Sequence, residues 1–266
     1  MKLTPVQINI AEYPAALHPY FDGAKLYDSS CSPNARVYFI DKDTGYFLKI
    51  GRVADLGHEY EMTRYFHTKG LAAAVVEYCF DAGQDYLLTE KLKGDDCTTV
   101  KYLEQPKRLA ELLGEQLSLL HSLDYRDCMS GCAVTNHTEQ YLLKAKRNKL
   151  TGNFDKSNFP NSFGYASEDE AWAVVEKYGR LLKTDTLLHG DYCLPNVILD
   201  DWSFSGFVDL DSGGVGDKHV DLFWGAWTLW FNLKTNKYRN RFLDAYGRDK
   251  IDEDLLRVIA AAEVFR

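Results

Sequence analysis

Three oxygen-bearing side chains occur close together in the last third of the chain: Asp191, Asn196 and Asp209. A carboxylate can orient a hydroxyl group and accept its proton, and carboxylate and amide oxygens are suitable ligands for hard cations such as Mg²⁺. Together they provide what phosphoryl transfer to a hydroxyl group requires. Each of the three could instead be an ordinary residue of a turn or a strand end, so this interpretation depends on their occurring as a set.

Short apolar runs flank this set and predict the elements that hold it. Residues 187–188 and 197–199 are aliphatic or β-branched, which predicts two short buried strands. The first two members of the set would then lie on the loop between these strands. Asp209 follows another apolar stretch at 207–208, so we expect it at the end of the next strand.

The first third of the chain predicts a β-hairpin that carries a lysine. Residues 36–40 and 46–50 are strand-like and are joined by a polar turn. The preceding loop, residues 29–34, is rich in small hydroxyl side chains, and such a loop can cover phosphate groups with its backbone N–H groups. Lys49 lies on the second strand among apolar neighbours, where it could also be a surface lysine whose stem covers apolar side chains.

A carboxylate is expected close to Lys49. Glu59 begins a stretch of helical periodicity that ends at Gly70, and it lies on or next to the inward-facing side of that helix. A carboxylate buried there requires a partner, and Lys49 is the candidate. Glu61 is the competing carboxylate, although it points roughly to the other side of the helix.

The pattern changes from strands to helices along the chain, so the predicted fold class is α+β with two lobes. The longer helices expected in the second part are residues 107–121, 168–182, 217–229 and 252–264. His121, at the end of the first of them, is interpreted as a capping or packing residue. We expect an N-terminal lobe at residues 1–90, a linker at 91–96 and a C-terminal lobe at 97–266.

The composition is that of an ordinary globular protein, with 45% hydrophobic and 26% charged residues in a chain of 266. The net charge of −8 disfavours a nucleic-acid partner and would suit a cationic small substrate. No stretch reaches the roughly 20 apolar residues of a membrane-spanning helix, and no basic region leads into an apolar run at the N-terminus. Six cysteines without the spacing of a zinc site or a disulfide framework favour free thiols. We expect a cytoplasmic protein, monomeric or weakly dimeric, without a membrane or nucleic-acid partner.

Residues 189–196, of sequence HGDYCLPN, and residues 205–210, of sequence SGFVDL, resemble the catalytic and metal-binding segment of the aminoglycoside phosphotransferases. The similarity is greatest to the 3′-phosphotransferase group and extends over nearly the whole chain. This resemblance implies a bilobal protein-kinase-like fold, in which a small antiparallel β-sheet lobe with one helix precedes a larger, mainly helical lobe. It also implies a kinase that transfers the γ-phosphoryl group of ATP, with GTP as an alternative donor, to a hydroxyl of an aminoglycoside, expected to be the 3′-hydroxyl.

The resemblance implies a role for each residue of the reacting set. Asp191 would orient the substrate hydroxyl and accept its proton. Asn196 and Asp209 would hold Mg²⁺ between the nucleotide phosphates. Lys49 would contact the α- and β-phosphates and be steadied by Glu59.

It also implies the residues that surround this set. Ser32 would cover the phosphates of the nucleotide, and Val37 would line its binding site. Phe47 would stack on adenine. The backbone from Glu90 to Leu92 would form hydrogen bonds with the adenine edge. His189 and Asp221 are expected to brace the catalytic loop. Glu263 and Phe265 are expected to bind the acceptor.

The chain departs from the family pattern mainly where the acceptor would bind. Asp211 and Ser212 replace a usual Gly-Arg pair, Ala262 replaces an acidic neighbour of Glu263, and residues 230–232 are apolar or neutral where acidic residues are frequent. A second hypothesis therefore keeps the kinase chemistry but takes another amine-bearing or amino-sugar acceptor, such as a choline-like metabolite, because the tryptophans of residues 224–230 could face a quaternary ammonium group. A third hypothesis is a nucleotide-binding relative that has lost catalysis.

Overall fold

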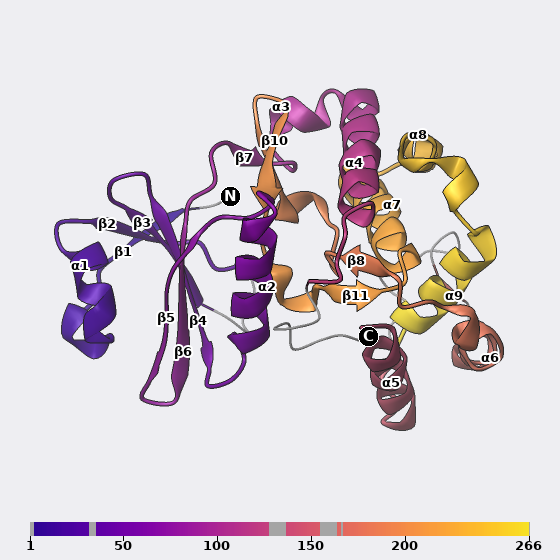
Figure 1. The fold of residues 1–266 in the computed structure, drawn as a ribbon, viewed down its shortest axis with the longest axis horizontal. Coiled ribbons are helices and arrows are strands. Elements are labelled where there is room, and N and C mark those ends of the chain that lie inside the picture. Colours follow the sequence, from indigo (N-terminus) through magenta and orange to yellow (C-terminus); the bar gives the residue numbers. More distant parts are fainter. Residues whose placement is uncertain (1–2, 32–35, 128–136, 155–163, 166, 266) are drawn as a thin grey trace. The chain divides into compact units, whose positions relative to one another are not determined.

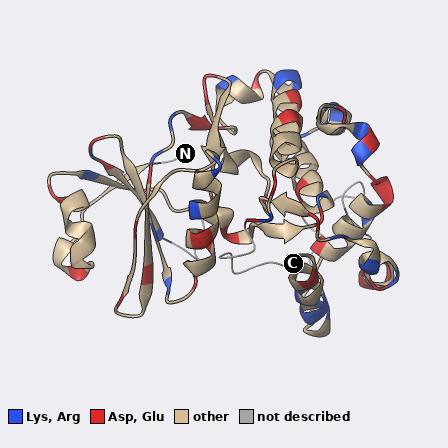
Figure 2. Ribbon diagram, viewed as in Figure 1, with Lys and Arg blue, Asp and Glu red and all other residues tan. Residues whose placement is uncertain are grey.

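The computed structural model describes residues 3–31, 36–127, 137–154, 164–165 and 167–265. It divides into two compact units, the first made of Met1–Thr99 and Pro195–Asp211, the second of Val100–Leu194 and Ser212–Arg266 (Figure 1). The antiparallel sheet of the first unit and the helices of the second confirm the predicted α+β class. Acidic and basic residues are interspersed along the chain in both units (Figure 2).

The first unit contains a six-stranded antiparallel sheet with the strand order β1-β2-β3-β4-β6-β5. Its strands are β1 (Thr4–Val6), β2 (Lys25–Asp28), β3 (Arg36–Asp41), β4 (Tyr46–Arg52), β5 (Val75–Asp81) and β6 (Gln84–Glu90). One face of the sheet packs on an N-terminal segment that the sequence patterns did not predict. This segment comprises η1 (Ile10–Glu12), η2 (Ala15–Leu17) and α1 (His18–Phe21). Leu17 and Phe21 enter the core formed by alternate residues of β3, β4 and β6.

Helix α2 (Gly57–Thr68) belongs to the same unit and confirms the predicted helix. Its buried side chains include Glu59, Met62 and Phe66. Successive strand residues point to opposite faces of a sheet, so Leu48 and Ile50 enter the core on the face of the N-terminal segment, whereas Lys49 points to the other face. This alternation makes Lys49 available to Glu59 on α2.

A second sheet in the first unit joins two distant parts of the chain. Strand β9 (Val197–Asp200) pairs with both β7 (Asp95–Asp96) and β10 (Ser203–Phe207). Phe207 also packs its ring against Phe66 of α2 at a centroid distance of 6.2 Å. The compact units therefore differ from the lobes expected from chain order. The prediction assigned residues 195–211 to the C-terminal lobe, whereas they belong to the first compact unit. The functional lobe boundary stays a prediction.

The second unit is mainly helical. Its helices are α3 (Val100–Leu103), α4 (Pro106–His121), α5 (His137–Leu150), α6 (Glu168–Tyr178), α7 (His219–Leu233), α8 (Arg239–Tyr246) and α9 (Glu253–Glu263), with short 3-10 turns at η4 (Gly179–Leu181), η7 (Asn236–Tyr238) and η8 (Arg248–Lys250). Two further turns, η5 (Leu194–Asn196) and η6 (Leu210–Ser212), lie where the chain passes from one unit to the other. α4 packs against α7 and α8, and α9 packs against α6 and α7. β8 (Thr186–Leu188) pairs with β11 (Gly214–Gly216). No helix in the described part of the chain has the length and apolar character needed to cross a membrane.

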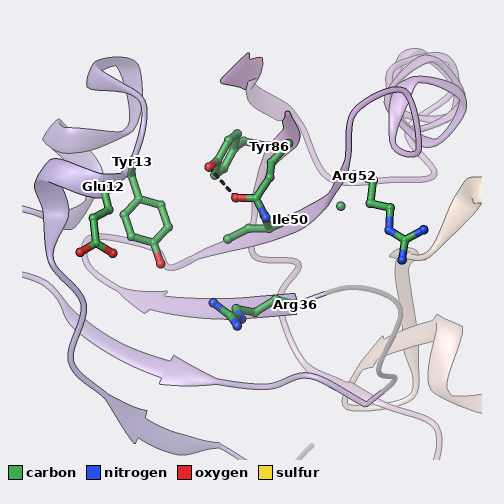
Figure 3. Close-up of a pocket in the computed structure, with 8 residues that line it drawn as sticks. Glu12, Tyr13, Arg36, Ile50, Arg52 and Tyr86 are labelled. Carbon is green, nitrogen blue, oxygen red and sulfur yellow. Dashed lines mark hydrogen bonds between the residues drawn. The ribbon is translucent and has the colours of Figure 1, made fainter. Parts of the chain in front are cut away.

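A cavity of about 290 Å³ lies between the N-terminal segment and the first unit's sheet (Figure 3). Glu12 and Tyr13 line it from the N-terminal segment, and Arg36, Ile50 and Arg52 line it from β3 and β4. Ile50 and Arg52 share one face of β4, which is the face opposite to that of Lys49. The cavity is therefore separate from the residues that were expected to contact a nucleotide.

Candidate active site

In the first unit, Lys49 binds two carboxylates at once. Its Nζ lies 2.6 Å from Glu59 Oε2 and 2.7 Å from Asp209 Oδ1. The Glu59 side chain is 7% exposed, whereas that of Asp209 is 50% exposed. The pair expected between Lys49 and Glu59 is therefore present, and Asp209 is an additional partner that neither strand alternation nor helical spacing could indicate. We call these three residues the lysine cluster.

Burial and charge act in opposite directions within the lysine cluster. Burial by itself would lower the pKa of Lys49, but the carboxylates of Glu59 and Asp209 outweigh it and the pKa is raised. Burial, together with the charge of Asp209, raises the pKa of Glu59 from 4.5 to about 7 against the opposing effect of Lys49. Lys49 therefore stays charged, while Glu59 changes its protonation near neutral pH.

Asp209 and Asn196 are brought together by the backbone. The N–H of Val208 donates a hydrogen bond to the C=O of Asn196 at 3.1 Å. Asp209 has a left-handed backbone with a φ of 60°, which is uncommon for a residue other than glycine and directs its carboxylate away from the course of β10. Asn196 is buried, at 8% exposure.

The chemistry of this pair fits Mg²⁺, which takes oxygen ligands and is usually held by one or two protein groups together with phosphate oxygens and water. Within the described ranges, no group of three or more His, Cys, Asp and Glu side chains forms a metal site by itself.

In the second unit, Asp221 holds the loop that carries Asp191. The backbone N–H groups of His189 and Gly190 each donate a hydrogen bond of 2.8 Å to the Asp221 carboxylate, as the resemblance implied. Asp221 is fully buried, at 0% exposure. Burial alone would raise its pKa, but hydrogen bonds from His121 and the backbone prevail and the pKa is lowered. Asp221 is thus a buried, ionised acceptor whose donors lie next to Asp191.

His121 and Tyr246 extend this network, and sequence reasoning missed both contacts. His121 Nε2 lies 3.1 Å from Asp221 Oδ2, and His121 Nδ1 lies 2.9 Å from the Tyr246 hydroxyl. The prediction of a packing histidine was incomplete, because its partners lie on α7 and α8, far away in the sequence. The resulting chain of hydrogen bonds runs from α8 through α4 to α7 and the catalytic loop.

Gly190 is required by the close approach of two backbone segments. Its φ is 81°, in the left-handed region that glycine favours. A Cβ atom at this position would lie 1.7 Å from the backbone oxygen of Ser212. The glycine between His189 and Asp191 therefore allows the loop to pack against the residues that follow Asp211.

The side chain of Asp191 has a neighbouring thiol. Cys193 Sγ lies 3.5 Å from Asp191 Oδ1, and the N–H of Cys193 donates to the C=O of Asp191 at 2.8 Å. The N–H of Asp191 donates to His189 Nδ1 at 3.3 Å. The backbone and the side chain of Asp191 are therefore both bonded to residues of the same loop. Sequence reasoning did not identify the contact with Cys193.

The residues expected to bind the nucleotide base and phosphates lie on β3, β4 and the segment after β6. Val37 is directly opposite Lys49 in the sheet, and the ring of Phe47 lies 5.2 Å from that of Phe39. The N–H of Glu90 donates to Ala74. Leu92 follows on the segment that leads to β7. Ser32 lies outside the described residues.

The two residues expected to bind the acceptor are both buried. Glu263, at 2% exposure, accepts hydrogen bonds from the Tyr141 hydroxyl at 2.8 Å and from Trp224 Nε1 at 3.1 Å. The Phe265 ring has no exposed surface and meets the ring of Trp172 edge-on at 5.6 Å. The structure gives both residues packing contacts, and their contact with an acceptor stays a prediction.

A model of the phosphotransferase enzyme family matches residues 11–259 of the chain. The chain belongs to this family. The phosphotransferase is 48% identical over 263 residues to a protein of Lactococcus lactis subsp. lactis (strain IL1403) named probable aminoglycoside 3′-phosphotransferase, with 99% of this chain and 98% of that protein covered. It is 33% identical to an aminoglycoside 3′-phosphotransferase of Niallia circulans, with 69% of this chain and 68% of that protein covered.

Solved structures show that the phosphotransferase has the fold expected from the resemblance. An aminoglycoside 3′-phosphotransferase of type VIII superposes with a TM-score of 0.71 at 22% identity, covering 96% of each chain. An aminoglycoside phosphotransferase of Streptomyces rimosus, solved with ADP and streptomycin, superposes with a TM-score of 0.74 at 18% identity, covering 97% of this chain and 99% of that one. The protein-kinase-like α+β architecture is thereby confirmed.

Proposed function

We propose that this phosphotransferase transfers the γ-phosphoryl group of ATP to the 3′-hydroxyl of an aminoglycoside and requires Mg²⁺. The observation that carries the proposal is the lysine cluster, found in a chain that matches its aminoglycoside 3′-phosphotransferase relative over 98% of that relative's length. The cluster supplies a charged lysine with a buried carboxylate beside it, which suits a phosphate-binding role. The choline-like acceptor has no comparable support, since Trp227 stacks on Phe231 of its own helix at a centroid distance of 4.8 Å.

Lys49 is assigned to the nucleotide phosphates, because its ammonium stays charged and is held in position by its hydrogen bond to Glu59. Val37 lies on β3 opposite Lys49, and Phe47 lies on β4 two positions before Lys49. Both are assigned to the rest of the nucleotide. The N–H groups of Glu90 and Lys91 already donate to Ala74 and Gly45, so the adenine edge is assigned to the donor that follows, the N–H of Leu92.

Asn196 and Asp209 are assigned to Mg²⁺. Held there together with the nucleotide, Mg²⁺ would supply positive charge that offsets the negative charge of the phosphates. Asp209 is half exposed and can therefore turn between the lysine and the metal without a buried charge being left behind. Asn196 is held in place by its backbone hydrogen bond to Val208.

Asp191 is assigned to the acceptor hydroxyl. Asp221 fixes the backbone immediately before Asp191, and the Cys193 thiol lies against one carboxylate oxygen, Oδ1. The Asp191 carboxylate is assigned to orient the hydroxyl and to take its proton as the bond between the hydroxyl oxygen and the γ-phosphorus forms and the bond from that phosphorus to ADP breaks. General-base catalysis of this kind contributes roughly a hundredfold to ten-thousandfold, part of which is positioning in phosphoryl transfer.

The test measures ADP release by the purified protein with Mg²⁺, with ATP or GTP, and with a panel of aminoglycosides. One pair in the panel should be an aminoglycoside and its 3′-deoxy analogue. We expect turnover of the first and none of the second, and loss of turnover in Asp191→Asn. Asp249→Asn removes an exposed carboxylate from the same unit and should retain wild-type activity. Turnover of the 3′-deoxy analogue would contradict the choice of hydroxyl, and no turnover of any aminoglycoside would contradict the function.

A further inference from the structure

His121 and Tyr246 lie at the ends of two helices that meet beneath the loop of Asp191. Both helices, α4 and α8, end at these residues. The His121 side chain is 3% exposed, Tyr246 is 3% exposed, and their rings meet edge-on at 5.5 Å. The family resemblance gave neither residue a role in the reaction. His121 contacts Asp221 directly, and Tyr246 contacts His121.

The hydrogen-bond partners of His121 determine how its ring is oriented. Asp221 is ionised and can only accept, so His121 Nε2 must carry a hydrogen and donate it to Asp221. His121 Nδ1 lies 2.9 Å from the Tyr246 hydroxyl, so the second ring nitrogen is hydrogen-bonded as well. The imidazole is therefore held at both nitrogens, by Asp221 on one side and by Tyr246 on the other. Tyr246 thereby fixes the orientation in which His121 Nε2 faces Asp221.

The third donor fixes the plane of the Asp221 carboxylate. One oxygen, Oδ1, accepts from Gly190, and the other, Oδ2, accepts from both His189 and His121. Without His121, the Asp221 carboxylate could rotate about its Cβ–Cγ bond and still keep a hydrogen bond to one of the two backbone N–H groups. With His121 in place, both oxygens are directed at the two N–H groups that precede Asp191.

We propose that His121 and Tyr246 are positioning residues for the reaction: Tyr246 holds the ring of His121, His121 orients Asp221, and Asp221 holds the backbone of the Asp191 loop. This inference deepens the proposed function and rests on it for its kinetic consequence. The arrangement follows the same logic as catalytic triads, in which a third residue orients a histidine through the nitrogen that does not act. Here the oriented group is a backbone-binding carboxylate.

The first test is Tyr246→Phe, which keeps the ring and removes only the hydroxyl. We expect kcat to fall roughly fivefold, which corresponds to the loss of about one hydrogen bond, with the KM values for ATP and acceptor unchanged. Tyr178→Phe is the matched control, because Tyr178 is 38% exposed at the end of α6. A purely structural role would lower the melting temperature of Tyr246→Phe and leave the kcat of the folded protein unchanged, which would overturn the proposal.

The second test separates the donor at Nε2 from the imidazole ring. A glutamine amide can reach the Nε2 position of histidine, so His121→Gln should restore most of the kcat that His121→Ala loses. Equal kcat in the two variants would contradict the proposal.

A third measurement does not depend on activity. Amide hydrogen exchange at His189 and Gly190 should be faster in Tyr246→Phe than in the wild type or in Tyr178→Phe. Unchanged exchange would overturn the proposal even if no aminoglycoside is turned over. If the wild type turned over no aminoglycoside but exchange were still faster in Tyr246→Phe, the positioning network would be supported and only the proposed acceptor would be rejected.

Discussion

Lys49 Nζ lies 2.7 Å from Asp209 Oδ1, so the lysine assigned to the phosphates also holds a residue assigned to the metal. The same ammonium lies 2.6 Å from Glu59 Oε2. The two carboxylates differ in exposure, since Glu59 is buried and Asp209 is half exposed. Under the proposed function, Glu59 would remain with Lys49, and Asp209 would leave Lys49 to bind the metal ion.

Asp209→Asn should change the response to Mg²⁺. The amide keeps one oxygen but removes the charge that attracts both the metal and Lys49. We expect a higher Mg²⁺ concentration for half-maximal activity and a kcat lower by roughly a hundredfold, as expected when a few kcal/mol of charge stabilisation are lost. Titrations of activity with Mg²⁺ test this. Asp55→Asn, an exposed carboxylate in the same unit, should behave as the wild type, and a wild-type Mg²⁺ response in Asp209→Asn would reject the metal assignment.

Glu59→Gln should remove a pH dependence of stability. The pKa of Glu59 is raised from 4.5 to about 7, so between these pH values the folded protein holds a proton that the unfolded chain has released. The free energy of unfolding therefore falls as the pH rises through this window. At about 1.4 kcal/mol per pKa unit, the loss of unfolding free energy over this window is between about 3 and 4 kcal/mol.

Urea unfolding of wild type and Glu59→Gln between pH 5 and pH 8 measures this effect, since only the wild type should lose stability through this group. Glu104→Gln is the control, because Glu104 is exposed. Parallel pH profiles of wild type and Glu59→Gln would show that Glu59 is ionised throughout.

The sequence was sufficient for the pair of Lys49 and Glu59 because each position followed from a local period. Strand alternation placed Lys49 on one face of β4, and the helical period placed Glu59 on the buried side of α2. Asp209 could not be predicted as a partner, because its direction depends on a left-handed backbone and on the pairing of β9 with β7. Such features depend on contacts between residues far apart in the sequence.

The helical unit was predicted less completely, for reasons that concern packing. Helix α5 was not predicted, since only Thr138 and Ala145 of its residues are buried and its apolar stripe is correspondingly weak. The role of His121 also required the tertiary structure, because Asp221 is 100 positions away in the sequence. In contrast, a bracing role of Asp221 followed from the resemblance, which included both the Asp191 loop and Asp221.

Cys193→Ala should lower kcat roughly fivefold without changing either KM. The thiol lies 3.5 Å from Asp191 Oδ1, and its loss should leave the carboxylate less well oriented, at a cost of about 1 kcal/mol. Cys193→Ser retains a donor and should recover most of the rate. Steady-state kinetics with Cys79→Ala as the control, a half-buried thiol on β5, test this. If the serine and alanine variants had the same kcat, the thiol would act through packing alone.

Tyr141→Phe tests whether Glu263 serves the acceptor or only the fold. The Tyr141 hydroxyl donates to the buried Glu263 carboxylate at 2.8 Å, so its removal should cost about 1–3 kcal/mol of unfolding free energy. If Glu263 also shapes the acceptor site, the KM for the aminoglycoside should rise several-fold while the KM for ATP stays constant. Trp224→Phe removes the second donor, at 3.1 Å, and should have the same effect.

Leu119 on α4 offers a control for these two substitutions, because it is 59% exposed and Leu119→Ala should alter neither stability nor KM substantially. Denaturant unfolding and steady-state kinetics on the same preparations distinguish the two roles of Glu263. Destabilised variants with an unchanged aminoglycoside KM would restrict Glu263 to the packing of α5, α7 and α9. A raised aminoglycoside KM at a temperature where the variants are fully folded would place its influence in the acceptor site, because loss of folded protein lowers kcat and leaves KM unchanged.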